Sequence, residues 1–254
     1  FDENRQLKLD ELSNVIKTEH IRVLLVNLPN NPSGMTVSKE TMIKLAEFAR
    51  ENDLILICDE VYNRVIFTGE PETMLSFAPE RTVVVNAASK EYLIPGHRIG
   101  YVISKSPTLT DVFLKKLVRC QNSCPNTVGQ DVFIEMLEKE VDELRKGESP
   151  SFLEPVIKQL KERRDALADA LQKAGFELFG NRPSDGTIFM IAKIPEEIKL
   201  SGEEFIEKAL EMKKISGIPA SACGKPGWIR FSFGSMTMED IERFGKNIIE
   251  VVEA

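Results

Sequence analysis

One lysine of the chain stands in a setting that suits covalent chemistry. Lys90 lies in the stretch VNAASKEYLIPGHRIGY, residues 85–101, where three small residues precede it and Arg98 follows eight positions later. A lysine amine can form a Schiff base with a carbonyl group and can move a proton, and burial favours the neutral amine that both steps need. A single lysine is more often a solvated surface residue, so this interpretation requires further polar groups beside it.

Such polar groups follow three apolar runs of strand length. The first run, 22–27, leads into VNLPNNPSG (26–34). The second, 54–58, leads into CDEVY (58–62), and the third, 82–86, leads into NAASK (86–90). Ligands bind beyond the carboxyl ends of strands in open α/β sheets, so three polar strand ends predict one binding site. Taken singly, each has an ordinary explanation: a turn for NNPSG, a helix cap for Asp59 and core packing for Tyr62.

The elements around these motifs predict an α/β fold. Residues 38–52 indicate a helix capped by Ser38, and residues 100–104 a fourth strand. Strands alternating with a helix favour a largely parallel sheet. The runs are apolar throughout rather than alternating, so we expect both faces of this sheet to be covered.

The second part of the chain predicts a smaller α+β domain. The expected helices are 107–146 with a break near 122–126, 151–174 ending at Gly175, 202–214, and one from Thr237 with Asp240 completing a capping box; the expected strands are 176–180, 187–193 and 228–233. We therefore divide the chain into residues 1–150 and 151–254.

Composition narrows the class of protein. The net charge is -7, which argues against nucleic acid as a partner. The four cysteines, Cys58, Cys120, Cys124 and Cys223, are scattered and lack the histidines of a zinc site, so we expect no metal and free thiols in a reducing cytosol. No apolar run is long enough to cross a membrane. These features predict a cytoplasmic protein.

Four motifs in a fixed order resemble one enzyme family. They are NLPNNPSG, DEVY, SKEYLIPGHRIGY and, late in the chain, WIRFSFG. Together they resemble the fold-type I, class I/II aminotransferases (aspartate and aromatic aminotransferase-like), which depend on pyridoxal 5'-phosphate, over nearly the whole sequence. The resemblance implies the pyridoxal-phosphate-dependent transferase fold, with 1–150 as the cofactor-binding large domain and 151–254 as the small domain. It also implies a homodimer that transfers an amino group from an L-amino acid to a 2-oxo acid.

The resemblance assigns the cofactor chemistry to four residues. Lys90 resembles the lysine that forms the Schiff base and then moves the substrate proton. Asp59 resembles the carboxylate that keeps the pyridine nitrogen protonated. Tyr62 and Asn31 resemble the pair that hydrogen-bonds the oxygen on the cofactor ring.

Four further residues complete the implied site. Val61 would pack against the cofactor ring, and Arg98, with Ser89, would bind the phosphate. Arg230, with Asn31, would hold the substrate α-carboxylate, for which the planar guanidinium of arginine suits better than lysine.

The chain departs from the family pattern at several points. Ala87 stands where some branches have a phosphate-binding serine, and His97 stands where tryptophan is common. Arg119 is near the position of an arginine that reaches a partner subunit's substrate, although a solvated helix arginine is the simpler interpretation.

The sequence also begins well inside the family pattern. We therefore expect the C-terminal portion of an aminotransferase, incomplete at its N-terminus and a weak binder of pyridoxal phosphate by itself. Two alternatives stay open: a carbon–sulfur β-lyase on the same scaffold, and an inactive portion or non-catalytic domain.

Overall fold

The computed structural model describes residues 7–112, 116 and 125–254. The chain divides into two compact units. Unit 1 contains the residues up to Pro29 together with Thr36–Pro155, and unit 2 contains Asn30–Met35 together with Val156–Ala254. The short segment Asn30–Met35, which carries the NNPSG motif, thus belongs to the unit that forms the later part of the chain.

Unit 1 is built on a four-stranded sheet with the order β1-β2-β3-β4. The strands are β1 (Val23–Asn27), β2 (Ile55–Asp59), β3 (Thr82–Ala87) and β4 (Gly100–Ile103). The first three pair in parallel and β4 is antiparallel to β3, so the sheet is mostly parallel, as predicted. The register places Asn27, Asp59 and Val85 in one row, which brings the carboxyl ends of three strands together.

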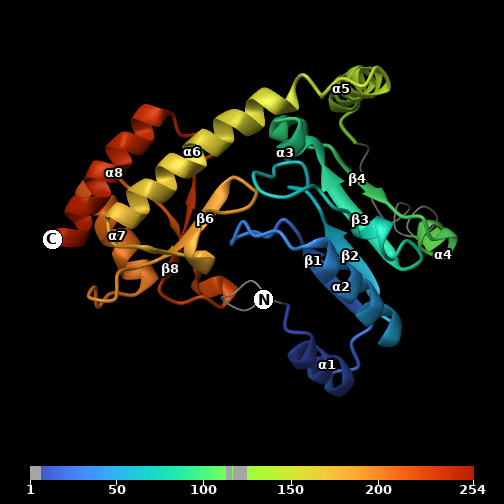
Figure 1. Cartoon of the computed structure of the whole chain (residues 1–254), viewed down its shortest axis with the longest axis horizontal. Coiled ribbons are helices and arrows are strands. Elements are labelled where there is room, and N and C mark those ends of the chain that lie inside the picture. The colour runs from blue at the N-terminus through green and yellow to red at the C-terminus, as the bar shows by residue number, and fades with distance from the viewer. Residues whose placement is uncertain (1–6, 113–115, 117–124) are drawn as a thin grey trace. The chain divides into compact units, whose positions relative to one another are not determined.

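One face of this sheet is covered by α2 (Lys39–Glu51), which Figure 1 shows beside β1 and β2. The side chain of Ser38 caps the helix by accepting a hydrogen bond from Thr41 N, as the sequence predicts. Leu45 and Ala49 on α2 pack into one cluster with Leu56 and Cys58 on the sheet. The helix α1 (Leu9–Thr18), which sequence analysis missed, adds Ile16 to the same cluster.

The opposite face of the sheet carries exposed apolar side chains. Val23 is 46% exposed, Leu25 69%, Val85 38% and Val102 50%. The prediction that both faces are covered was therefore wrong for this chain. The strands have the apolar composition of a sheet buried on both sides, but burial also requires a second layer, and the described residues do not supply one over these four side chains.

The remaining elements of unit 1 are short, apart from α5. They are η1 (Met74–Ser76), α3 (Ala88–Glu91), η2 (Pro95–His97), α4 (Pro107–Asp111) and α5 (Thr127–Arg145). The side chain of Asn126 caps α5, and the expected break at 122–126 lies mostly outside the described residues. Phe133 of α5 meets Tyr92 edge to face and stacks on Tyr101, which anchors α5 beside α3 and β4.

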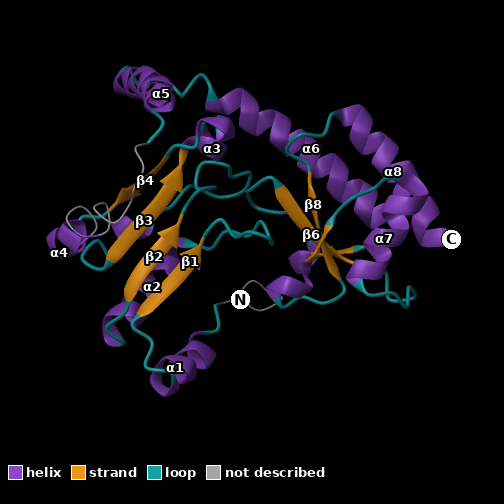
Figure 2. Cartoon of the chain, turned by 180° about the vertical axis from the view of Figure 1, so that it is seen from behind, coloured by secondary structure: helices purple, strands orange, loops and turns teal. Residues whose placement is uncertain are grey.

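Unit 2 has an antiparallel sheet with the order β5-β6-β8-β7. Its strands are β5 (Glu177–Leu178), β6 (Phe189–Lys193), β7 (Ile218–Pro219) and β8 (Trp228–Ser232); its helices are α7 (Gly202–Lys213), α8 (Met238–Glu253) and most of α6 (Leu153–Lys173), with η5 (Phe179–Asn181) and η6 (Ala220–Cys223) between them. Figure 2 shows β6 and β8 beside these helices. The predicted capping box of Thr237 and Asp240 is present, and Gly175 has the positive φ of 84° that ends α6.

Aromatic packing fills the core of unit 2. Phe176 meets Phe205 and Phe231 edge to face, with ring centroids 5.6 and 6.0 Å apart, and Phe231 meets Phe244 at 5.4 Å. Phe205 has no exposed surface. Each such ring removes a large apolar area from water, so this cluster is a main source of the stability of unit 2.

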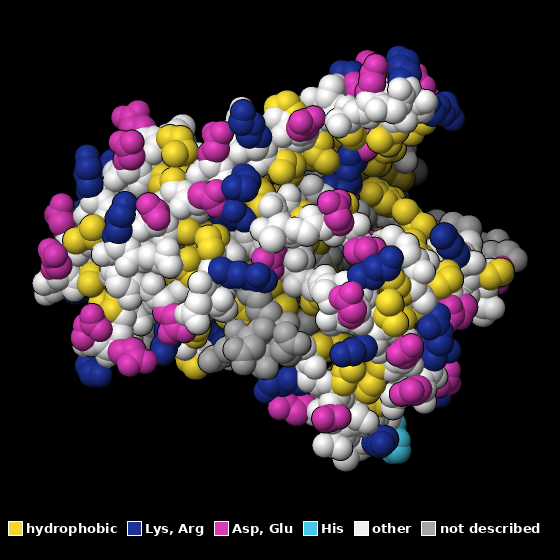
Figure 3. Space-filling view, in the orientation of Figure 1, with side chains coloured by type: hydrophobic (Ala, Val, Ile, Leu, Met, Phe, Trp, Pro, Cys, Tyr) yellow, Lys and Arg dark blue, Asp and Glu magenta, His cyan; other side chains and the backbone are white. Residues whose placement is uncertain are grey.

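The surface of the chain is mixed in charge. Figure 3 shows acidic and basic side chains interspersed over the visible face. Within the described part of the chain, no helix is long and apolar enough to cross a membrane.

Candidate active site

The predicted lysine faces an aromatic ring inside unit 1. Lys90 lies in α3, which begins directly after β3, and its Nζ is 5.7 Å from the ring centroid of Tyr62. Tyr62 is buried, with 4% of its surface exposed, and Lys90 is half-buried. Tyr62 lies in the turn that follows β2, so the ends of neighbouring parallel strands deliver the amine and the phenol to each other.

Asp59 ends β2 and is held by the backbone around it. Its Oδ1 accepts a hydrogen bond from Val61 N at 3.2 Å, and its carbonyl accepts bonds from Leu28 N and from Asn27 Nδ2, each at 3.2 Å. These bonds join the ends of β1 and β2. The carboxylate is half-buried and fixed in direction, as the partner of a heteroaromatic nitrogen must be.

Glu60 is a site-adjacent residue that sequence analysis missed. Its Oε1 accepts hydrogen bonds from Thr73 Oγ1 at 3.1 Å and from Met74 N at 3.0 Å. Burial raises the pKa of Glu60 to about 7, and the nearby carboxylates of Glu91 and Asp59 add to the shift. Glu60 thus ties the segment after β2 to η1 through a carboxyl group that titrates near neutral pH. Its place in DEVY was the signal available in the sequence.

The predicted phosphate ligands lie on α3 and in the turn after it. Ser89 is half-buried on α3 and precedes Lys90. Arg98 is exposed, has a φ of 56°, and donates from Nη1 to the carbonyl of Pro95 at 2.9 Å. The hydrogen bond of Arg98 to Pro95 therefore lies within the turn that contains both residues. Val61, expected against the cofactor ring, is half-buried.

The two residues expected to hold the substrate α-carboxylate, Arg230 and Asn31, contact each other within unit 2. Arg230 on β8 donates from Nη1 to Asn31 Oδ1 at 2.9 Å, although 199 positions separate the two residues. The guanidinium carbon lies 4.3 Å from the ring centroid of Phe189, which supports its plane from one side. The structure thus brings together two residues that the family resemblance assigns to the substrate carboxylate.

Gly34 explains how Asn31 reaches Arg230. Gly34 has a φ of 68° and accepts a backbone hydrogen bond from Gly186 N at 2.9 Å. A Cβ at this position would lie 2.4 Å from the Cβ of Ser184. Only glycine therefore lets the NNPSG segment dock here.

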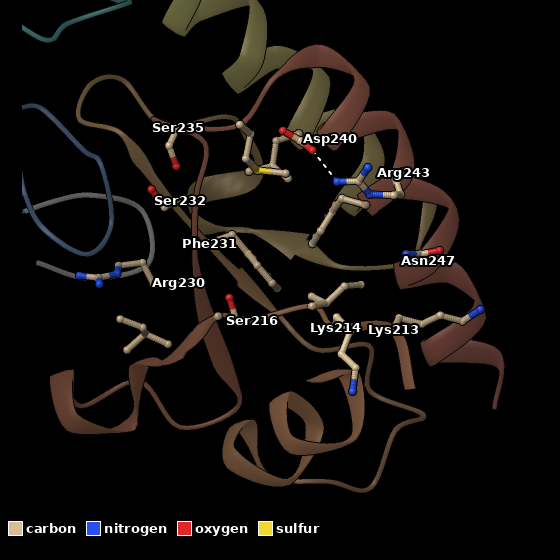
Figure 4. A pocket seen from close by; sticks show the side chains of 16 residues that line it. Lys213, Lys214, Ser216, Arg230, Phe231, Ser232, Ser235, Asp240, Arg243 and Asn247 are labelled. Atoms are coloured by element: carbon tan, nitrogen blue, oxygen red, sulfur yellow. Dashed lines mark hydrogen bonds and ion pairs between the residues drawn. The ribbon is translucent and has the colours of Figure 1, made fainter. Parts of the chain in front are cut away.

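Unit 2 also contains a cavity of 540 Å³ beside β8, lined by Arg230, Lys213, Arg243 and other residues. Figure 4 shows the Arg230 side chain projecting away from Lys213 and Arg243. Lys213 pairs with Glu250, and Arg243 pairs with Asp240 at 2.5 Å. The positive charges of Lys213 and Arg243 are thus already paired with carboxylates. Asn31 does not line this cavity, so Arg230 contacts Asn31 outside it.

The side chains of unit 1 fit pyridoxal phosphate by their chemistry. Asp59, Tyr62 and Lys90 lie at or just after the ends of the neighbouring strands β2 and β3. The carboxylate suits a pyridine nitrogen, the phenol suits a ring oxygen, and the amine suits an aldehyde. No cluster of three possible metal ligands occurs among the described residues. His97, at the variant position in the sequence motif, is half-buried and accepts at its carbonyl from Asn126 Nδ2. Arg119 lies outside the described residues.

Comparison with known proteins identifies the family. The family model "Aminotransferase class I and II" matches residues 1–248. The chain belongs to this family. It is 30% identical over 238 residues to an aspartate aminotransferase of Thermotoga maritima, covering 92% of this chain and 57% of the relative. It is 28% identical over 244 residues to aromatic-amino-acid aminotransferase 2 of Thermococcus litoralis, covering 92% of this chain and 58% of the relative.

Solved structures agree with the sequence comparison. The chain matches the aromatic aminotransferase of Pyrococcus horikoshii with a TM-score of 0.85 at 27% identity, covering 98% of this chain and 64% of that one. The α/β aminotransferase fold is therefore established for this chain, as is its membership of a family that uses pyridoxal phosphate. The chain spans about three fifths of the length of these relatives.

Proposed function

We propose that this protein takes part in the transfer of an amino group from an L-amino acid to a 2-oxo acid, with pyridoxal 5'-phosphate carried covalently by Lys90. The observation that carries the proposal is the placement of the Lys90 amine at the face of the buried Tyr62 ring, next to the strand end that holds Asp59. When bound, the cofactor supplies an electron sink for the substrate's α-carbon.

Lys90 has two tasks in this proposal. Its amine holds the cofactor between turnovers, and once released it moves the proton that leaves the substrate's Cα. The Tyr62 ring keeps the amine at the strand ends rather than in bulk water. Ser89 and Arg98 are the residues we assign to the phosphate.

Asp59 and Tyr62 set the electronic state of the ring. The Asp59 carboxylate, fixed by Val61 N, keeps a proton on the pyridine nitrogen. We assign the ring oxygen to the Tyr62 hydroxyl as hydrogen-bond donor and the face of the ring to Val61. The role of Asp59 requires both of its carboxylate oxygens to act as hydrogen-bond acceptors. An asparagine at this position would have only one acceptor oxygen.

Arg230 is the group we assign to the substrate α-carboxylate. Its side chain is already oriented by Asn31 and Phe189, so little rotational freedom is lost when a carboxylate binds. Arg230→Lys keeps the charge but loses the planar pair of donors. We expect this variant to raise the KM for the amino acid more than it lowers kcat.

The substrates are an amino acid and a 2-oxo acid, and relatives named for aspartate and for aromatic amino acids suggest the first donors to test. We further expect a homodimer in the cytoplasm. Both are expectations from the family.

Transfer of label tests the proposal. The protein is incubated with pyridoxal phosphate, ¹⁵N-labelled L-aspartate or L-phenylalanine, and 2-oxoglutarate. Appearance of ¹⁵N-glutamate, absent with Lys90→Ala, supports an aminotransferase. Pyruvate and ammonia formed from a sulfur amino acid without any 2-oxo acid would support the β-lyase instead. No product in either assay from folded protein would favour a non-catalytic chain.

A further inference from the structure

We propose that Arg64, Tyr92 and Glu140 form a clamp that positions Lys90 against Tyr62. Arg64 lies two residues after Tyr62, and Tyr92 lies two residues after Lys90. Glu140, on α5, binds both of them. The clamp therefore joins the two segments that carry the proposed lysine and its aromatic neighbour. The inference rests on the proposed function, because that function requires the Lys90 amine to be held in one position.

The clamp consists of four close polar contacts. Arg64 Nη1 donates to Tyr92 Oη at 2.8 Å and to Glu140 Oε2 at 2.9 Å, and Arg64 Nη2 donates to Glu140 Oε1 at 2.5 Å. Tyr92 Oη donates to Glu140 Oε2 at 2.5 Å. Each member thus contacts the other two, and the guanidinium meets the carboxylate with both prongs. Such paired, charged hydrogen bonds fix direction as well as distance.

Burial makes the clamp sensitive to the loss of any member. The side chains of Arg64 and Glu140 are 22% and 15% exposed. Burial alone would lower the pKa of Arg64, but its bonds to Glu140 and the nearby negative charges raise that pKa above the usual value. Burial and the bond to Glu140 likewise raise the pKa of Tyr92. Both shifts favour the protonated forms of Arg64 and Tyr92. Removal of either member of the Arg64–Glu140 pair leaves a poorly solvated charge.

The helix that carries Lys90 needs external anchors. α3 has four residues, too few for a helix to be stable through its own backbone bonds. Tyr92 continues the turn, since its N–H donates to Ala88 O at 3.1 Å. Its ring is buried and meets Phe133 edge to face at 5.2 Å. The position of Tyr92 therefore sets the position of this turn.

Helical geometry links the clamp to the direction of Lys90. Residues two apart on a helix point about 200° away from each other, because each residue turns the chain by about 100°. Fixing Tyr92 on one side of the turn therefore directs Lys90 to the opposite side. Arg64 lies inside the turn that Tyr62 begins, because Val65 N donates to Tyr62 O at 2.8 Å, so holding the Arg64 side chain restrains this turn. Arg64 and Glu140 are positioning residues that act through Lys90 and Tyr62.

The test measures the Lys90–Tyr62 contact without any cofactor. Lysines are reductively methylated with ¹³C-formaldehyde, and nuclear Overhauser contacts are recorded between N-methyl and tyrosine ring protons. The chain has three tyrosines, so the ring signals are few. Lys90→Arg and Tyr62→Phe assign the two signals. The variants are Arg64→Met, Glu140→Gln and Tyr92→Phe, the last of which removes one hydroxyl and serves if the others fail to fold.

Arg81→Met is the matched control. The Arg81 side chain is 20% exposed, close to the value for Arg64, and donates to Leu54 O at 2.8 Å near the amino ends of β2 and β3. Like Arg64→Met, Arg81→Met removes one positive charge from unit 1, but at the opposite end of β2 and β3. Thermal unfolding of every variant shows whether the measured protein is folded.

We expect the contact in the unsubstituted chain and in Arg81→Met, and its loss in the folded clamp variants. We also expect the rate at which borohydride traps pyridoxal phosphate on Lys90 to fall by about 100-fold in Arg64→Met, the size of effect produced by a misplacement of about 1 Å. A contact that persists in folded clamp variants, or that is equally lost in Arg81→Met, overturns the proposal. A clamp-dependent contact in a chain that never traps the cofactor on Lys90 would support the clamp and refute the proposed function.

Discussion

The two sheets of the molecule differ in how completely they are covered. In unit 2, β6 and β8 carry Met190, Ile191, Ile229 and Phe231 with 3% or less of their surface exposed. In unit 1, β1 carries Leu25 at 69% exposure on the face opposite α2. Unit 2 is thus a packed scaffold that holds one arginine in place. Unit 1 carries Lys90 on the short helix α3, Asp59 at the end of β2 and Tyr62 in the turn that follows.

This difference separates the proposed site residues: Arg230 lies on the better-packed sheet of unit 2, whereas Lys90, Tyr62 and Asp59 lie in unit 1. Lys90 and Tyr62 lie close in sequence to residues that hydrogen-bond across unit 1: Glu60 binds Met74 N, and Arg64 binds Glu140. Arg230 is positioned by a strand whose neighbours are aromatic and buried. Three substitutions test this contrast, and the chain provides separate probes for it: its one tryptophan, Trp228, is in unit 2 and its three tyrosines are in unit 1.

The largest effect is expected in the core of unit 2. Phe205→Ala removes a ring with no exposed surface that packs edge to face on Phe176. We expect a loss of about 3–5 kcal/mol in the free energy of unfolding of unit 2. Urea unfolding followed by Trp228 fluorescence measures it. A change below about 1 kcal/mol would mean that the aromatic cluster does not stabilise unit 2 as described.

A smaller, pH-dependent effect is expected at Glu60. The folded pKa of Glu60, about 7, lies above the ordinary glutamate value of 4.5, so near neutral pH the folded state holds a proton that the unfolded state releases. Stability therefore falls as pH rises from 4.5 through 7. Glu60→Gln retains an acceptor for Met74 N but cannot ionise. We expect its stability relative to the unsubstituted chain to rise by about 2–3 kcal/mol between pH 4.5 and 8.

Tyrosine fluorescence or amide hydrogen exchange of unit 1 follows this change. Equal pH dependence of the two proteins would contradict the assignment of a raised pKa to Glu60. The pKa of Glu91 is also raised by burial, but Glu91 is present in both proteins, so the part of its pH dependence that comes from its own burial cancels in the difference.

The smallest effect is expected on the exposed sheet face. Leu25→Ala should change the free energy of unfolding of unit 1 by less than about 0.5 kcal/mol, because the side chain is already largely in water. Leu56→Ala, on the covered face of the neighbouring strand, is the control and should cost about 2–5 kcal/mol. Hydrogen exchange of unit 1 measures both. Equal losses would show that the Leu25 face is covered in solution.

Local signals in the sequence predicted much of the fold. Ser38, Thr237 with Asp240, and Gly175 mark helix ends by their own chemistry, and each was confirmed. The two-residue strand β7 was missed because an element so short is defined by its pairing with β8, which the sequence does not show. Exposure of the sheet face was mispredicted because composition gives the preference of a residue and not the presence of a covering layer.

The candidate site divides in the same way. Lys90, Asp59, Tyr62 and Arg230 stand in motifs, and their residue types suggest their chemistry. Glu140 is 76 positions from Arg64 and stands in an ordinary charged helix, so its contact with Arg64 becomes visible only in the structure. Residues with a proposed reactive role could be named from their motifs, whereas a residue such as Glu140, which contacts their segments across a long stretch of sequence, could not.

The central claim is that Lys90 is the attachment point of pyridoxal phosphate. The most direct test mixes the protein with the cofactor, reduces the mixture with borohydride, which makes even a weak complex permanent, and maps the modified peptide by mass spectrometry. The account predicts a pyridoxyl group on the peptide that contains Lys90, and its loss in Lys90→Ala. Modification spread over other lysines, with equal labelling of Lys90→Ala, would contradict it.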